Sequence, residues 1–217
     1  MDIYRGVTLK LNSEIIRFKS KRNEVIMCDG VVKKHFATAE AAAFEAKELR
    51  TLHAMGVRVP EVYELDGAVL KMQYILGETL PDIIAHLENS TGLPDLEAVA
   101  DKAKKIIGWF YDFYKAVNTD ETGEIRGDVN GRNFVFDGSY CWGVDFEEKS
   151  FGDKEKDIGR LIAFALTYEP PGTLVKAELA DMLLKYAIVE LGVLAEEVCH
   201  QRDLELEAMK RRRTKKS

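Results

Sequence analysis

Apolar and polar residues follow two different periods along this chain. In its N-terminal part, short apolar runs with the two-residue alternation of strands are separated by turns such as Asp29-Gly30 and Asp66-Gly67. The runs cover residues 7–11, 15–18, 25–28, 31–36, 62–65 and 69–76. This pattern predicts a small antiparallel sheet.

One helix is expected between these runs. Thr38 can cap its start, Gly56 can end it, and Phe44, Leu49 and Leu52 mark its buried stripe. The segment therefore predicts a single helix packed against the sheet.

From Pro81 onward the apolar residues recur at helical spacing. Further helices are expected over residues 158–166, 173–191 and 195 to about 210. The chain is thus predicted to be α+β, with a β-rich part over residues 1–76, a helical part over 77–209 and a basic, disordered tail over 210–217.

A hairpin interrupts the helical part. Residues 134–136 and 141–144 are apolar, and Asp137-Gly138 lies in the turn between them. A hairpin brings its outer ends together, so Asn133 and Asp145 should be neighbours, with Asp128 one loop away. Such oxygen ligands suit Mg2+ bound to phosphates. The alternative is a solvated hairpin with polar ends.

The sequence around this hairpin is similar to a known pattern. G-D-V-N-G-R-N, followed after the hairpin by V-D-F-E, resembles the catalytic loop and metal-binding motif of the protein-kinase-like superfamily. The resemblance implies that Asp128 orients the attacking hydroxyl, that Asn133 and Asp145 bind Mg2+, and that Asp157 braces the loop. Arg126, where the family usually has His, and Glu147, where it has Gly, depart from the pattern.

The N-terminal part extends the resemblance. Val31-Val32-Lys33 is similar to the strand whose lysine binds the α- and β-phosphates of ATP, which implies a catalytic and nucleotide-binding role for Lys33. Lys34 is its competitor, because consecutive strand residues face opposite sides. The resemblance makes Glu45 the partner of this lysine, with Glu48 as a solvent-facing alternative.

Two segments are expected to contact the nucleotide. M-Q-Y-I-L-G-E-T-L resembles the linker between kinase lobes, which places main-chain groups around Gln73 and Ile75 on the adenine and Met72 behind it. An ordinary edge strand would look similar. The turn around Lys21 could offer N–H groups and positive charge to phosphate, although it lacks the usual glycines and an exposed polar turn is the alternative.

Together these elements imply a two-lobed protein-kinase-like fold and an ATP- and Mg2+-dependent phosphotransferase. Only twelve positions separate Asp145 from Asp157, too few for a long activation segment. This resembles the Bud32, RIO and aminoglycoside-phosphotransferase branches and favours an atypical serine/threonine protein kinase. A small-molecule kinase and a nucleotide-binding pseudokinase or scaffold are the alternatives.

Charge and cysteine content indicate which kinds of binding partner and which cellular compartment to expect. Residues 210–217 hold six of the 31 Lys and Arg, and the rest of the chain holds 25 against 37 Asp and Glu, a net charge of −12. The negative charge outside the tail argues against extensive binding of nucleic acid, whereas the basic tail could bind an acidic partner or RNA. Three scattered cysteines and the lack of a long apolar run predict a cytoplasmic protein with no membrane partner, whose substrates are a nucleotide and a protein or small-molecule hydroxyl.

Overall fold

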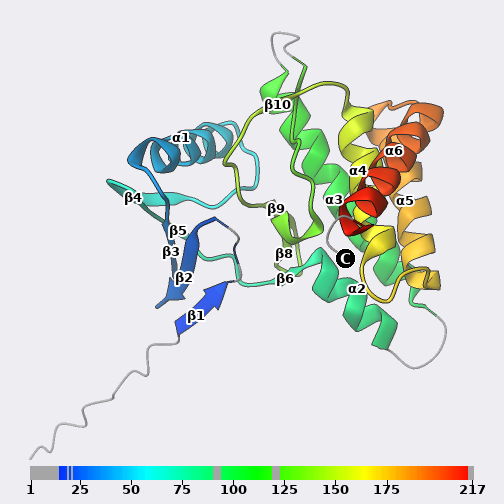
Figure 1. Ribbon diagram of the computed structural model, residues 1–217, viewed down its shortest axis with the longest axis horizontal. Helices are drawn as coiled ribbons and strands as arrows, with labels where there is room; N and C mark the ends of the chain where they lie inside the picture. The colour runs from blue at the N-terminus through cyan, green and yellow to red at the C-terminus, as the bar shows by residue number, and fades with distance from the viewer. Residues whose placement is uncertain (1–14, 19, 21, 90–93, 119–122, 215–217) are drawn as a thin grey trace, which may run out of the picture.

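The computed structural model describes residues 15–18, 20, 22–89, 94–118 and 123–214. Figure 1 shows a β-rich N-terminal lobe beside a helical C-terminal lobe, which confirms the predicted two-lobed α+β arrangement. The expected strand over residues 7–11 lies outside the described residues.

The N-terminal lobe is a five-stranded antiparallel sheet with strand order β1-β2-β3-β5-β4. Its strands are β1 (Ile15–Phe18), β2 (Glu24–Cys28), β3 (Val31–His35), β4 (Val62–Asp66) and β5 (Val69–Gln73). Val32 of β3 lies opposite Met27 and Met72, and all three side chains are buried. This face is therefore the inner face of the sheet.

Helix α1 (Ala39–Ala54) packs against β4 and β5. It begins as predicted, because the Thr38 hydroxyl accepts a hydrogen bond from the N–H of Ala41 at 3.2 Å. Gly56 follows its last turn with φ +83°, a conformation that glycine adopts without strain. The helix buries an acidic residue, Glu45, together with its apolar stripe.

The C-terminal lobe is built around the long helix α3. Its helices are α2 (Leu80–Asn89), α3 (Leu96–Val117), α4 (Lys154–Thr167), α5 (Leu174–Leu191) and α6 (Ala195–Thr214). Helix α3 packs on α5, and α4 packs on α6. A Cβ on Gly159 of α4 would lie 2.7 Å from the backbone N of Arg202, so this glycine lets α4 and α6 approach closely.

The hairpin predicted between the helices is present as β8 (Phe134–Phe136) and β9 (Cys141–Gly143). Strand β6 (Glu78–Thr79) joins β8, while β7 (Glu124–Ile125) pairs with β10 (Ser150–Phe151). The short helical turn η1 (Gly131–Asn133) leads into β8. Phe134 packs against Trp109 and Phe110 of α3, so the hairpin is anchored in the core of the helical lobe.

The C-terminal tail differs from the expectation. Residues 210–214 are the last turn of α6, where the Nη2 of Arg212 bonds to Glu205 at 2.5 Å and the Nη2 of Arg213 bonds to the carbonyl of Thr167 at 3.3 Å. Positive side chains at a helix C-terminus are favoured by the helix dipole, which offsets their mutual repulsion. The prediction of a tail that is disordered from residue 210 was therefore wrong.

None of the helices in the described part of the chain is long and apolar enough to cross a membrane.

Candidate functional site

A buried lysine of β3 connects the two lobes. The Nζ of Lys34 lies 2.6 Å from Oε2 of Glu45 in α1, 2.5 Å from Oδ1 of Asp145 after β9, and 2.9 Å from Oε1 of Glu147. The Lys34 side chain is only 5% exposed, and Glu45 is fully buried. The ion pair to Glu45 was predicted, but for the wrong lysine.

The structure corrects Lys33 to Lys34. Val32, Lys34 and Phe36 alternate toward the inner face of the sheet and are buried, whereas Lys33 faces the other side, opposite Lys71. In a strand, adjacent side chains point to opposite faces, so only one of the two lysines can reach Glu45. The inward position of Phe36 is the sequence feature that could have fixed this register.

Electrostatics keep this lysine charged. Burial by itself would lower the pKa of Lys34, but Glu45 and Asp145 outweigh it and the pKa is raised. Burial raises the pKa of Glu45 against the opposing effect of Lys34. For Asp145, burial is outweighed by Lys34 and Arg126, which lower its pKa. The site therefore holds a protonated lysine beside an ionised Asp145.

The hairpin brings Asn133 and Asp145 together as predicted. The N–H of Val144 donates to the carbonyl of Asn133 at 2.9 Å, and the Nδ2 of Asn133 donates to the carbonyl of Asp128 at 3.3 Å. Asp128 is exposed, with its Oδ1 accepting from the N–H of Asn130 at 3.3 Å. The carboxylate of Asp128 thus faces solvent at the edge of the site.

Asp145 has a left-handed backbone, with φ +69°. Only a few per cent of non-glycine residues adopt this conformation, which costs about 1–3 kcal/mol and is concentrated at functional sites. The strained backbone aims the Asp145 carboxylate at Lys34.

Arg126 ties the loop of residues 127–133 to the hairpin. Its Nη2 donates to the carbonyls of Val144 at 2.9 Å and Asp145 at 2.6 Å, and its guanidinium lies 4.2 Å from the ring centroid of Phe146. The Nε atom is buried without a hydrogen-bond partner, and burial lowers the pKa of this side chain. The unusual arginine noted in the sequence therefore positions the backbone that carries Asp145.

Asp157 of α4 braces the same loop, as the resemblance implied. Its carboxylate accepts hydrogen bonds from the N–H groups of Arg126 at 2.6 Å and Gly127 at 2.9 Å, and from the hydroxyl of Tyr114 at 2.9 Å. Gly127 has φ +72°, and a Cβ there would lie 2.0 Å from the Oγ of Ser150. The turn before Asp128 thus requires glycine.

Tyr168, which the sequence did not indicate, supports the other end of the loop. Its hydroxyl accepts from the N–H of Gly131 at 3.0 Å and lies 3.3 Å from Oδ1 of Asn130. Burial raises the pKa of Tyr168 to about 12. Because it follows α4 and lies far from the loop in sequence, no local pattern marks it.

The residues expected to contact the nucleotide lie between the lobes. Met72 and Ile75 are buried, and Gln73 is half-buried at the end of β5. The N–H of Gln73 donates to the carbonyl of Glu61 at 2.9 Å, so this N–H group already has a hydrogen-bond acceptor within the N-terminal lobe. Lys21 lies outside the described residues.

The turn before β2 contacts the segment after Asp145. The Nη1 of Arg22 lies 3.0 Å from Oε1 of Glu148, and the side-chain amide of Asn23 bonds to Glu147. These contacts join the turn of the N-terminal lobe to the helical lobe.

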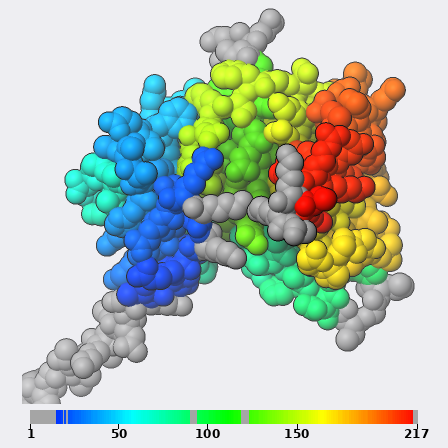
Figure 2. Space-filling model, viewed as in Figure 1, coloured from blue at the N-terminus to red at the C-terminus, as the bar shows by residue number. Residues whose placement is uncertain are grey.

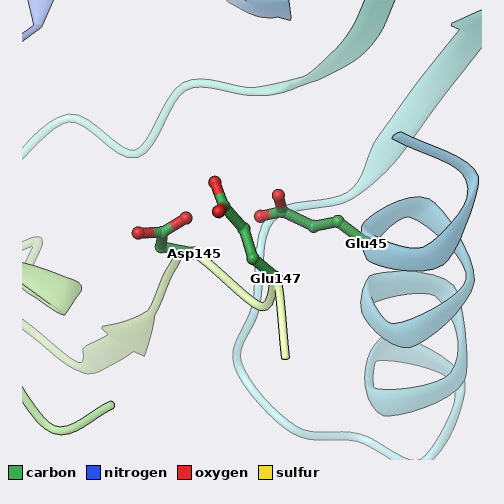
Figure 3. A group of neighbouring side chains, drawn as sticks. All are labelled: Glu45, Asp145 and Glu147. Atoms are coloured by element: carbon green, nitrogen blue, oxygen red, sulfur yellow. The ribbon is translucent and has the colours of Figure 1, made fainter. Parts of the chain in front are cut away.

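Three carboxylates in the site could share a cation. Oxygen atoms of Glu45, Asp145 and Glu147 lie within 4.8 Å of one another (Figure 3). All three pair with Lys34, but Glu45 is fully buried and also accepts from the N–H of Phe146, whereas the side chains of Asp145 and Glu147 are 41% and 24% exposed. The accessible carboxylates of Asp145 and Glu147 are hard oxygen donors of the kind that suits Mg2+. Glu147 was missed because the sequence motif treats its position as a glycine.

The fold resembles that of several solved phosphotransferases. An aminoglycoside-3'-phosphotransferase of type VIII superposes with a TM-score of 0.53 at 15% identity, covering 89% of this chain and 92% of that chain. A choline/ethanolamine kinase family protein from Mesorhizobium loti gives 0.47 at 16% identity, over 93% and 88%. ADP-bound aminoglycoside phosphotransferase APH(2'')-Ib gives 0.47 at 16% identity, over 82% and 79%.

Sequence comparison adds nothing to this similarity, because no protein-family model and no curated protein matches the chain significantly. The type VIII similarity extends over both lobes and shows that the chain has the protein-kinase-like fold.

Proposed function

We propose that this protein is an Mg2+- and ATP-dependent phosphotransferase that acts on an alcohol group. The observation that carries the proposal is the contact of one buried lysine, Lys34, with Glu45 of the N-terminal lobe and Asp145 of the C-terminal lobe. A buried lysine between two carboxylates is costly to desolvate and gives little stability over apolar packing. A positively charged group at the junction of the lobes is, however, what triphosphate binding requires.

Each residue has a defined part in this proposal. Lys34, held by Glu45, contacts the phosphates of ATP, and Asp145 and Asn133 hold Mg2+ with Glu147 beside them. The bound ion supplies neutralisation of the phosphate charge. Asp128, exposed at the edge of the site, accepts a hydrogen bond from the acceptor hydroxyl and aims its oxygen at the γ-phosphate. Phosphoryl transfer depends mainly on such positioning and charge neutralisation.

As the acceptor we favour a small-molecule alcohol over a protein serine or threonine. The segment after Asp145 returns through β10, which pairs with β7, and Lys149 bonds to Glu48 and Glu124 at 3.0 Å each. These contacts hold the segment against the rest of the protein, so it offers little extended surface on which a peptide could bind. The serine/threonine protein kinase expected from the sequence is the alternative outcome of the same experiment.

The test is transfer of label from [γ-32P]ATP in the presence of Mg2+, with pooled alcohols and with acceptor proteins, alongside ADP release. Asp145→Asn is the informative variant, because asparagine tolerates the left-handed backbone while losing the charge. We expect turnover by the wild type and at least a hundredfold loss in Asp145→Asn. Lys33→Met, which faces away from the site, is the control and should retain activity.

Two other results would change the proposal. Mg·ATP binding without turnover on any acceptor would favour the pseudokinase alternative. A wild type that neither binds nor turns over Mg·ATP would refute the proposed function.

A further inference from the structure

The segment that follows Asp145 contacts helix α1 at two places. The N–H of Phe146 donates to Oε1 of Glu45 at 3.0 Å, and the Nζ of Lys149 lies 3.0 Å from Oε2 of Glu48. Figure 2 shows the yellow-green atoms of this part of the chain beside the light-blue atoms of α1. The segment that carries the proposed Mg2+ ligand is therefore attached to the N-terminal lobe.

Lys149 also contacts the helical lobe. Its Nζ lies 3.2 and 3.0 Å from the two carboxylate oxygens of Glu124 in β7. Strand β7 pairs with β10, which begins one residue after Lys149, and β7 leads directly into the stretch that carries Arg126 and Asp128. One ammonium group thus joins α1 to the strand in front of the 127–133 loop.

Glu48, considered from the sequence as a solvent-facing residue, is buried in the structure. Its side chain is 11% exposed and that of Glu124 is 13% exposed, whereas that of Lys149 is 39% exposed. A carboxylate that is largely removed from water needs a cation nearby, because its unpaired charge is costly to bury. Among the residues that the structure describes, Lys149 is the only cation paired with either glutamate.

Without Lys149 the two glutamates would repel each other. Both approach the same nitrogen to 3.0 Å, so their carboxylates are close neighbours of like charge. Burial by itself would lower the pKa of Lys149, but Glu124 and Glu48 outweigh it and raise the pKa. A charged lysine therefore holds α1 and β7 together where two negative charges would otherwise separate them.

We infer that Lys149 is a positioning residue for phosphoryl transfer, which holds α1 and the segment after Asp145 in the arrangement that aligns Lys34 with Asp145. This inference rests on the proposed function. Glu45 and Glu48 are three residues apart on α1 and therefore lie on the same face of the helix. Glu45 holds Lys34 within the site, while Glu48 and Lys149 fix the same helix beside it.

Loss of Lys149 should affect turnover more than nucleotide binding. The ion pair of Lys34 with Glu45 lies within the N-terminal lobe and does not involve Lys149. Transfer, however, requires groups of both lobes to meet at the γ-phosphate, and a misplacement of about 1 Å can cost about a hundredfold in rate. The expected effect is therefore on kcat.

The test is steady-state ADP release by the full-length protein, with the same pooled alcohols and acceptor proteins, at varied Mg·ATP and KCl. Lys149→Gln removes the charge and Lys149→Arg keeps it. Lys71→Gln is the matched control, because Lys71 is 33% exposed and pairs with Glu64 at 2.7 Å within the N-terminal sheet. Circular dichroism and melting temperature confirm that the variants fold.

We expect kcat to fall about tenfold in Lys149→Gln, with less than about a twofold change in KM for ATP. Lys149→Arg should recover most of the loss, and Lys71→Gln should change neither constant. The ratio of the wild-type kcat to that of Lys149→Gln should shrink as KCl is raised, because salt screens a partly exposed ion pair. A side chain that acted only by packing would not give this dependence on salt.

A second set of variants tests the partner on α1. Glu48→Gln should also lower kcat, because it breaks the contact between α1 and Lys149. The double variant Lys149→Gln/Glu48→Gln should be no slower than Lys149→Gln alone, since both substitutions remove the same ion pair. Additive losses would mean that the two residues act separately and would contradict the inference.

An unchanged kcat in Lys149→Gln would overturn the inference, as would an equal loss in Lys71→Gln or no recovery in Lys149→Arg. If the wild type shows no turnover, amide hydrogen exchange of peptides covering residues 39–54 and 145–151 decides. Faster exchange of both in Lys149→Gln, but not in Lys71→Gln, would show that Lys149 holds these segments although the proposed transfer fails. Equal exchange in the wild type and Lys149→Gln would refute the positioning role itself.

Discussion

The Nζ of Lys34 lies 2.6 Å from Oε2 of Glu45, and both side chains are removed from water. This pair joins β3 to α1 inside the N-terminal lobe. Glu45 also accepts, through its Oε1, the N–H of Phe146 at 3.0 Å, so the same carboxylate reaches the segment that carries Asp145. The pair therefore sets both the charge of the site and the approach of the two lobes.

Replacing Lys34 with Met should abolish phosphoryl transfer and lower the free energy of unfolding by about 3–5 kcal/mol, because the charge of Glu45 is left buried without its cationic partner. Lys33→Met, the adjacent residue on the opposite face, should change stability by less than about 0.5 kcal/mol. Urea unfolding and ADP release measure the two effects. The double variant Lys34→Met/Glu45→Leu should regain stability but not activity; equal effects of Lys33→Met and Lys34→Met would contradict the register.

Arg126 should affect turnover more than nucleotide binding. Its guanidinium holds the carbonyls of Val144 and Asp145, so Arg126→Met releases the strained backbone of Asp145 without removing a ligand. We expect kcat to fall about tenfold or more while KM for ATP changes less, since the ion pair of Lys34 with Glu45 remains. Arg126→Gln, which keeps one donor, should recover part of the loss.

Arg58→Met is the control for removing an arginine stacked on an aromatic ring. Arg58 lies 4.0 Å from the ring centroid of Tyr140 and pairs with Asp112 outside the site. Its loss should leave kcat unchanged. If both arginine variants lose kcat alike, Arg126 is no more than a packing residue.

The sequence predicted those features that depend on local chemistry. The Thr38 cap, the Asp29-Gly30 turn and the hairpin from Phe134 to Gly143 each follow from residues a few positions apart. The approach of Asn133 to Asp145 followed from the hairpin alone. These elements were enough to indicate the fold.

Features that depend on long-range packing were missed. Lys33 and Lys34 are chemically identical, and of their neighbours only Phe36, which is buried on the same face as Lys34, distinguishes them. Tyr168 meets Gly131 across the helical lobe, and the charged last turn of α6 is ordered by Glu205 and Thr167, which lie elsewhere in the chain. No residue next to Tyr168 or to the last turn of α6 in the sequence marks these contacts.

Asp157 should be important for stability as well as for activity. Asp157→Ala leaves the N–H groups of Arg126 and Gly127 and the hydroxyl of Tyr114 without their acceptor in a buried position. We expect the free energy of unfolding to fall by about 3 kcal/mol, measured by urea unfolding. Asp153→Ala, at the exposed start of the same helix and without a side-chain cap bond, should cost less than about 1 kcal/mol. A similar loss in both variants would show that α4 needs charge at its start and not the bonds of Asp157.

Tyr168 should make stability depend on alkaline pH. Burial raises its pKa from 10.0 to about 12 in the folded protein. Below pH 10 the phenol is protonated in both states; between pH 10 and about 12 the unfolded chain loses the proton while the folded protein keeps it. Each proton released only on unfolding lowers the free energy of unfolding by about 1.4 kcal/mol per pH unit, so the stability contributed by the neutral phenol is lost over this range.

Tyr168→Phe isolates this contribution. The variant should be less stable than the wild type at pH 8 by about 1–2 kcal/mol, because the N–H of Gly131 loses its acceptor. Its stability should then fall less steeply between pH 10 and 11, so that the two proteins converge as the pH rises. Urea unfolding at half-unit intervals from pH 8 to 11 measures both slopes, and ionisation of the other tyrosines is common to the two proteins. Parallel slopes would mean that Tyr168 ionises as an ordinary surface phenol and does not hold the 127–133 loop.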